Sequence, residues 1–157
     1  TITALGGFST NTIKNVFPAE KNDFIGRSTF FSQILIARKF NHHVSLQVSP
    51  VWMYSDYQTR FEANTNLLSL GIAGRVRLTK RIHMTGEYYY QLNEKSLDLI
   101  PPLSIGFDIE TGGHIFQLMF SNSQSMFEKA FLFDTVNKWQ DGGIFFGFNI
   151  NRVFYFK

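Results

Sequence analysis

The chain has 157 residues, enough for one domain, and carries 18 Phe, while only 17% of its residues are charged, below the roughly 25% of typical soluble proteins. Its 15 basic and 12 acidic residues leave a formal net charge of +3. Because the basic residues are scattered rather than gathered with aromatic ones, nucleic-acid binding is not expected. The absence of cysteine excludes disulfides and cysteine-ligated metals, and it fits an exported protein.

The first half of the chain is predicted to hold four strands. Alternation of apolar and polar residues, the period of a strand, runs through residues 1–8, 26–40, 44–54 and 65–78. Residues 41–43 form a predicted tight turn, and the polar stretches 9–23 and 55–64 are predicted loops. Pro50 interrupts the order of the third strand, which predicts relaxed hydrogen bonding near a rim or a bulge.

The second half of the chain predicts four more strands, at residues 82–91, 103–110, 114–121 and from 144 onward. The clearest signal is LSIGFDIETGGHIFQLMFSN at residues 103–122, two alternating runs joined by Thr-Gly-Gly. This predicts a hairpin about nine residues tall, and about nine to eleven tilted residues span a bilayer. The glycine pairs at 6–7, 112–113 and 142–143 are interpreted as turns at strand ends, since none has a phosphate-loop spacing.

The connections between these strands indicate a membrane barrel. No run approaches the roughly 18 apolar residues of a transmembrane helix, so a spanning protein would be built of strands. Long and short connections alternate, as in outer-membrane barrels, whose short turns are periplasmic. Aromatic residues of an expected outer girdle end two strands: Trp52, Tyr54, Tyr88 and Tyr90. The sequence therefore predicts an all-β, antiparallel up-and-down transmembrane barrel, with about eight strands in one domain over residues 1–157.

Several stretches resemble one protein family. They read ILIARKF at 34–40, LTKR at 78–81, GEYYYQL at 86–92, SIGFDIETGGHIFQLMFSNSQSMFEKAF at 104–131 and FGFNINRVF at 146–154. Together they are similar to the uncharacterised outer-membrane β-barrel proteins of gliding and gut-type Gram-negative bacteria. The resemblance implies fold and location in the bacterial outer membrane, and it brings no established activity or catalytic residue. Proteins of this family look about twice as long as this chain. The resemblance therefore implies that this chain is the C-terminal part of a barrel of roughly twelve strands.

A candidate charge layer faces the lumen near the short turns. Its members lie on the polar faces of their strands: Arg75, Arg77, His83, Glu87, Asp108, Glu110 and Gln117. One interpretation is a charged constriction that selects small solutes. The other is a salt-bridged layer that fills a narrow barrel and leaves no pore. Energy does not choose between them, because desolvation cancels much of the Coulombic gain.

The last long connection carries an apolar stripe that is too large to leave in water. Its candidate partner or mouth residues are Met126, Phe127, Phe131 and Phe133. The simplest expectation is that this stretch extends the neighbouring strands. The alternatives are that it folds over or into the barrel mouth, or that it contacts a partner.

No catalytic, cofactor or metal site is expected. His83 and Glu87 share a face but lie about 13 Å apart along a strand, too far for an acid–base couple. The adjacent His42 and His43 are interpreted as polar rim residues rather than metal ligands. The predicted function is that of a channel, a passive transporter or a structural component of an envelope complex. The rival hypothesis is a soluble lipocalin-like barrel that binds an apolar ligand.

Three kinds of partner are expected for an outer-membrane barrel. The lipid of the outer membrane surrounds the strands, and other envelope proteins contact the loops. The C-terminal Phe154-x-Phe156 resembles the signal that barrel-insertion machinery reads on outer-membrane proteins.

Overall fold

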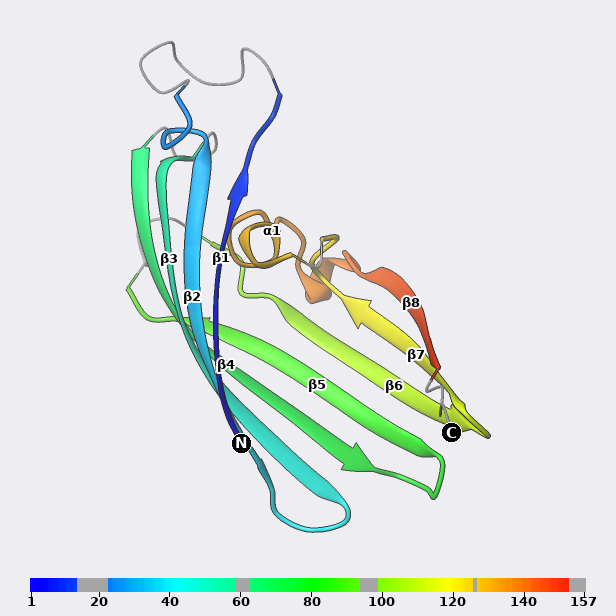
Figure 1. The fold of residues 1–157 in the computed structure, drawn as a ribbon. Helices are drawn as coiled ribbons and strands as arrows, with labels where there is room; N and C mark the ends of the chain where they lie inside the picture. The colour runs from blue at the N-terminus through cyan, green and yellow to red at the C-terminus, as the bar shows by residue number, and fades with distance from the viewer. Residues whose placement is uncertain (14–22, 59–62, 94–98, 126, 153–157) are drawn as a thin grey trace.

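Eight antiparallel strands form one sheet in the order of the sequence (Figure 1). The computed structural model describes residues 1–13, 23–58, 63–93, 99–125 and 127–152. The sheet curls into a half-barrel, with the short helix α1 beside β1 and β2 in the view of Figure 1. The elements are β1 (Ile2–Thr10), β2 (Ser28–Lys39), β3 (Val44–Gln58), β4 (Ala63–Arg77), β5 (Ile82–Gln91), β6 (Leu103–Thr111), β7 (His114–Ser121), α1 (Glu128–Phe133), the 3₁₀ turn η2 (Trp139–Asp141) and β8 (Phe145–Arg152).

The convex face of the sheet is apolar and exposed. Many large apolar side chains on this face are exposed, among them Ile72 at 51%, Phe148 at 54% and Ile2 at 75%. A continuous apolar face of this extent is unfavourable in water, whereas hydrocarbon solvates it. The fold therefore has the inside-out character of a membrane barrel. No helix among the described residues is long and apolar enough to cross a membrane.

The predicted register of β4 is confirmed. Leu68 and Ile72 are exposed on the convex face, while Arg75 lies opposite Ser45 of β3 and Thr85 of β5 on the concave face. Because side chains alternate along a strand, a slip of one residue would turn both β4 arginines toward the apolar side.

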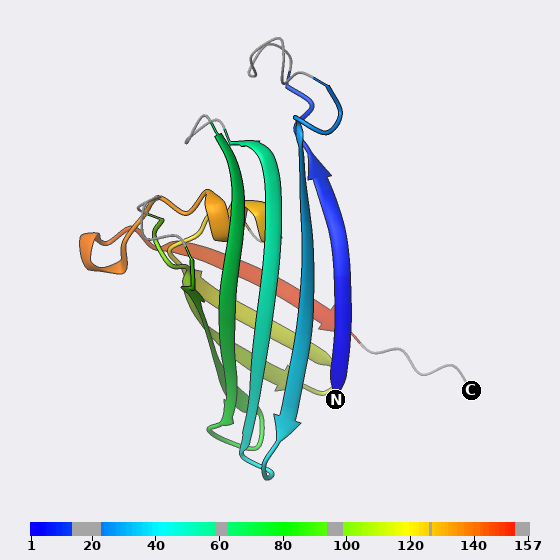
Figure 2. The same ribbon diagram turned by 90° about the vertical axis from the view of Figure 1, so that its left-hand side faces the viewer.

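Strands β3 and β4 extend beyond the predicted loop. The loop expected over residues 55–64 is wrong for most of its length, since β3 runs to Gln58 and β4 begins at Ala63. A register shift lies between Ser55 and Gln58. Polar side chains do not prevent pairing where both faces of a hairpin meet water, because the ladder is made by backbone groups. Together with β2, the two strands rise above β5, β6 and β7 (Figure 2).

Two predictions about β1 and β3 are also wrong. Gly6 and Gly7 are not a turn but lie inside β1, opposite Ser32 and Phe31. A Cβ on Gly7 would lie 2.7 Å from the Phe31 ring, so glycine makes room for that ring. Pro50 does not interrupt the alternation either. Its side chain keeps to the convex face, where Pro50 lies opposite Leu70. The relaxed hydrogen bonding predicted at Pro50 is confirmed, because the β2–β3 ladder breaks beside it, between the Gln33–Val51 and Ile36–Val48 pairs.

Some expectations about the chain's ends stay predictions. The Phe154-x-Phe156 motif lies outside the described residues. The half-barrel places β1 and β8 at its two edges. The expectation of a barrel of roughly twelve strands, with this chain as its C-terminal part, remains a prediction.

The facing of β4 predicts opposite outcomes for arginine at two adjacent positions. Ile72→Arg puts a charge in the apolar band and is expected to destabilise the protein by about 2 to 4 kcal/mol. Ala73→Arg puts the same side chain into a concave-face cavity and is expected to cost much less. Urea unfolding in detergent, followed by heat-dependent gel mobility, measures both. Equal losses at the two positions would contradict the assigned facing.

Candidate functional site: the concave face

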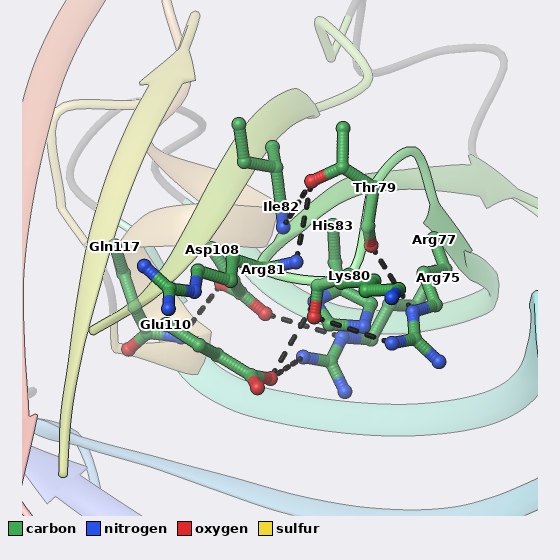
Figure 3. A network of polar contacts seen from close by, with 10 residues as sticks. All are labelled: Arg75, Arg77, Thr79, Lys80, Arg81, Ile82, His83, Asp108, Glu110 and Gln117. Carbon is green, nitrogen blue, oxygen red and sulfur yellow. Dashed lines mark hydrogen bonds and ion pairs between the residues drawn. The ribbon is translucent and has the colours of Figure 1, made fainter. Parts of the chain in front are cut away.

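The strand register brings charged residues of three strands together on the concave face. His83 of β5 lies opposite Asp108 of β6, and Asp108 lies opposite Gln117 of β7. Arg75 approaches this group from β4. Its Nε lies 3.2 Å from Asp108 Oδ2, and its Nη2 lies 3.3 Å from Glu110 Oε1. One guanidinium therefore bridges two carboxylates (Figure 3).

Side-chain hydrogen bonds extend this group toward β8. Gln117 Nε2 donates to Asp108 Oδ1 at 3.0 Å. Its Oε1 accepts from Asn149 Nδ2 at 3.0 Å and from Asn151 Nδ2 at 2.7 Å. On the other side His83 Nδ1 lies 3.5 Å from Glu110 Oε1. The sequence interpretation missed the two asparagines, although their alternation with Phe148 and Ile150 was a usable signal.

The structure brings five of the seven predicted charge-layer residues into contact, namely Arg75, His83, Asp108, Glu110 and Gln117. Arg77 points instead to its own turn, where Nε donates to Thr79 O at 3.0 Å and Nη2 to Lys80 O at 3.2 Å. Glu87 lies nearer the other end of β5 and lines two cavities with Ser104 and Met119. The predicted layer is thus a cluster around Arg75 with two outlying members.

The cluster borders a cavity that reaches solvent. The cavity has a volume of about 360 Å³ and is lined mostly by small side chains, with Arg75 and Glu87 among its polar groups. The side chains of Arg75 and Glu110 are each 42% exposed, so water reaches the cluster. Ligand pockets usually have volumes of about 300 to 1,000 Å³. The concave face can therefore hold a small polar solute beside fixed charges of both signs.

The opposite half of the concave face is apolar and is covered by α1. Val51, Met53, Leu67 and Tyr89 form a buried cluster with Leu132 and Phe133 of the helix. The expected strand extension is therefore wrong, because residues 128–133 form a helix that packs on the concave wall. The physical reason is that β3 and β4 are apolar on both faces here, which leaves an inner surface for a helix to cover. The alternative that this stretch folds over or into a barrel mouth stays a prediction.

The four candidate mouth residues take different positions. Phe133 is fully buried, and the Phe131 ring meets Tyr89 edge-on, with ring centroids 5.6 Å apart. Phe127 is 51% exposed. Met126 lies outside the described residues. A second cavity, of about 280 Å³, lies where Glu128 and Phe131 of α1 face Gln33, Glu87 and Tyr89 of the wall.

Polar contacts fasten the segment that carries α1 to the start of β6. Asn122 Nδ2 donates to Pro101 O and Asn137 O, at 3.1 and 3.0 Å. Trp139 Nε1 donates to Leu103 O at 2.9 Å. Both ends of the segment are therefore held against the wall, which fixes α1 over the concave face. Among the described residues, no group of three or more His, Asp and Glu is arranged to hold a metal ion.

Comparison with protein families matches residues 1–154 to one described as a membrane bound beta barrel domain (DUF5777). No curated protein and no solved structure matches the chain. A membrane barrel agrees with the exposed apolar face, and it decides against the rival hypothesis of a soluble lipocalin-like barrel.

Removal of the central guanidinium should destabilise the cluster. Arg75→Met leaves Asp108, which is largely buried, without its cationic partner. The expected loss is about 1 to 3 kcal/mol in the free energy of unfolding. The triple variant Arg75→Met, Asp108→Asn, Glu110→Gln should recover part of this loss, because it removes the unpaired charges as well. Urea unfolding in detergent compares the two, and a triple variant less stable than the single one would contradict the pairing.

A glycine opposite Tyr89 should be required for the packing under α1. A Cβ on Gly71 would lie 2.5 Å from Cε1 of the Tyr89 ring, while the Tyr89 hydroxyl accepts from Gln33 Nε2 at 3.1 Å. Gly71→Ala is therefore expected to destabilise the protein by about 1 to 3 kcal/mol through overpacking. A double-mutant cycle with Tyr89→Ser should show strong coupling between the positions. Additive losses would mean that the ring is not the obstacle.

Proposed function

The chain belongs to the DUF5777 family of membrane bound beta barrel domains, and we propose that it is an outer-membrane channel for the passive passage of small polar solutes. The observation that supports this proposal is the solvent-reached cluster around Arg75, which borders a cavity of about 360 Å³. The cluster lies on the concave face of the half-barrel, the face that would line the lumen of a closed barrel.

The assignment to the outer membrane rests on the connections between strands. The turns after β2, β4 and β6 are short, at residues 40–43, 78–81 and 112–113. In outer-membrane barrels such turns face the periplasm. The partners that we propose with this location are the surrounding lipid and the barrel-insertion machinery. We propose no catalytic role for the chain.

Helix α1 would set the size limit of this channel. It covers the apolar half of the concave face. Leu132 of the helix belongs to the buried cluster there, and Phe131 packs against that cluster. A solute that passes from the long loops to the short turns would meet α1 first and the charged cluster afterwards. Size would thus be selected before charge, by different residues of the same wall.

A structural role in an envelope complex is the second candidate. Phe127 and Val136 are both exposed on the segment that carries α1, although both are large and apolar. Exposed apolar groups on a polar rim are typical of a contact with another protein. This role and passage of solute are compatible, but only passage of solute needs an open lumen.

Single-channel conductance in planar bilayers tests the proposal. The full-length protein should conduct, and Phe131→Ser with Phe133→Ser should raise the conductance severalfold, because the helix loses the side chains that hold it on the wall. Phe127→Ser is the matched control, since it removes an exposed Phe of the same segment. Its conductance should equal that of the unmodified protein.

The same experiment separates the two candidate functions. Absence of conductance in the unmodified protein and in the double variant would refute the channel. Loss of co-purified envelope proteins in Phe127→Ser, with conductance absent throughout, would support the structural role instead. Heat-dependent gel mobility confirms that each variant is folded before it is measured.

A further inference from the structure

Positive charge gathers at the short-turn end of the sheet. The stretches RKFNHH at 38–43 and RLTKRIH at 77–83 together hold five Lys or Arg and three His, and neither contains Asp or Glu. Among the described residues, four carboxylates lie instead in the connections at the opposite end, namely Asp23, Glu128, Asp134 and Asp141. The turns after β2 and β4 therefore carry a net positive charge.

A groove lies among these cations, between the turns that follow β2 and β4. Its volume is about 340 Å³, and its lining residues are His43, Arg77, Leu78, Thr79 and Lys80. The backbone N–H of Arg77 donates to His43 O at 2.7 Å, which fixes the two turns side by side. Three basic side chains, His43 from one turn and Arg77 and Lys80 from the other, thus line one small hollow.

The charge of Arg77 is available to a ligand. Two of its N–H groups bind the neutral carbonyls of Thr79 and Lys80, whereas Arg75 is paired with Asp108 and Glu110 (Figure 3). The carbonyls hold the guanidinium in place without neutralising it. A fixed guanidinium loses little conformational entropy on binding, and its planar donors suit a phosphate group.

The groove lies where the apolar band of the sheet ends. Leu78, one of its lining residues, is 53% exposed and follows the convex-face residues Ile72 and Val76 along β4. On the neighbouring turn Phe40 is also exposed, and the Arg38 guanidinium lies 5.3 Å from the centre of its ring. In a membrane barrel, apolar residues beside cations at this height meet the glycerol and headgroup region of the bilayer.

We propose that this groove binds the phosphate group of an anionic phospholipid in the leaflet at the short-turn side. Lys80 and His43 approach the phosphate from opposite turns. Arg77 lies on the concave face of β4, but its guanidinium bends to the rim, where it binds the turn carbonyls of Thr79 and Lys80 and donates to the phosphate. Leu78 contacts the apolar part of the same lipid. The lipid would then fix the height and tilt of this end of the barrel. This binding needs the membrane location, but it does not depend on passage of solute through the lumen.

Native mass spectrometry of the full-length protein in a neutral detergent tests the proposal. Phosphatidylglycerol, added in steps, should bind at one tight site, and phosphatidylcholine should bind more weakly. Lys80→Gln should weaken phosphatidylglycerol binding about fivefold, the effect of one cation beside an anionic membrane surface. Lys80→Arg should restore it, and Arg77→Gln combined with Lys80→Gln should abolish the tight site.

Arg38→Gln is the matched control, because it removes one positive charge from the end of β2, beside the neighbouring turn, and leaves the groove intact. Unchanged binding in this variant supports the groove, whereas a loss equal to that of Lys80→Gln would mean diffuse attraction and overturn it. Competition by inorganic phosphate at equal concentration would mean a site for free phosphate and would also overturn the lipid assignment. Tight phosphatidylglycerol binding that is unchanged in Lys80→Gln would also overturn the proposed site. Heat-dependent gel mobility checks the fold of each variant.

Discussion

Pairing between neighbouring antiparallel strands is the interaction on which the rest of this structure depends. In hydrocarbon no water is present to satisfy backbone N–H and C=O groups, so a spanning chain must satisfy them within the sheet. The same ladders fix which side chains stand in one row across the strands. His83, Asp108 and Gln117 meet because β5, β6 and β7 pair in this register. The geometry of the candidate site is therefore a direct consequence of the membrane constraint.

The concave face divides into two parts with different chemistry. Near the long connections it is apolar and covered by α1. Tyr89 of the wall packs against Phe131 of the helix and accepts a hydrogen bond from Gln33 of β2. Near the short turns it is polar, and Arg75 bridges two carboxylates there. Glu87 lies beside both cavities, between the two parts. A wall with this division can restrict size at one level and charge at another.

Charge is also distributed unevenly along the barrel axis. Within the lumen, basic and acidic side chains neutralise one another, as the contacts of Arg75 show. At the short-turn rim, Arg77 binds only neutral carbonyls among the contacts described for it, and Lys80 and His43 lie beside it. A cation paired inside the lumen stabilises the wall, whereas an uncompensated cation at the bilayer surface attracts anions. Two arginines spaced by one residue on β4 thus have different partners, two carboxylates for Arg75 and two backbone carbonyls for Arg77.

The sequence by itself determined the strands, their order, the facing of β4 to β7 and the three short turns, because alternation with a period of two is a local property. It also placed Arg75, Asp108 and Glu110 on one face. Only the tertiary structure decided that Gly6 and Gly7 lie within a strand, that residues 55–58 continue β3, and that Asn149 and Asn151 join the cluster. It alone decided that α1 folds onto the wall, since a short apolar stripe suits a strand or a helix equally. The difference lies in the inner surface of β3 and β4, which exists only once distant residues have been paired.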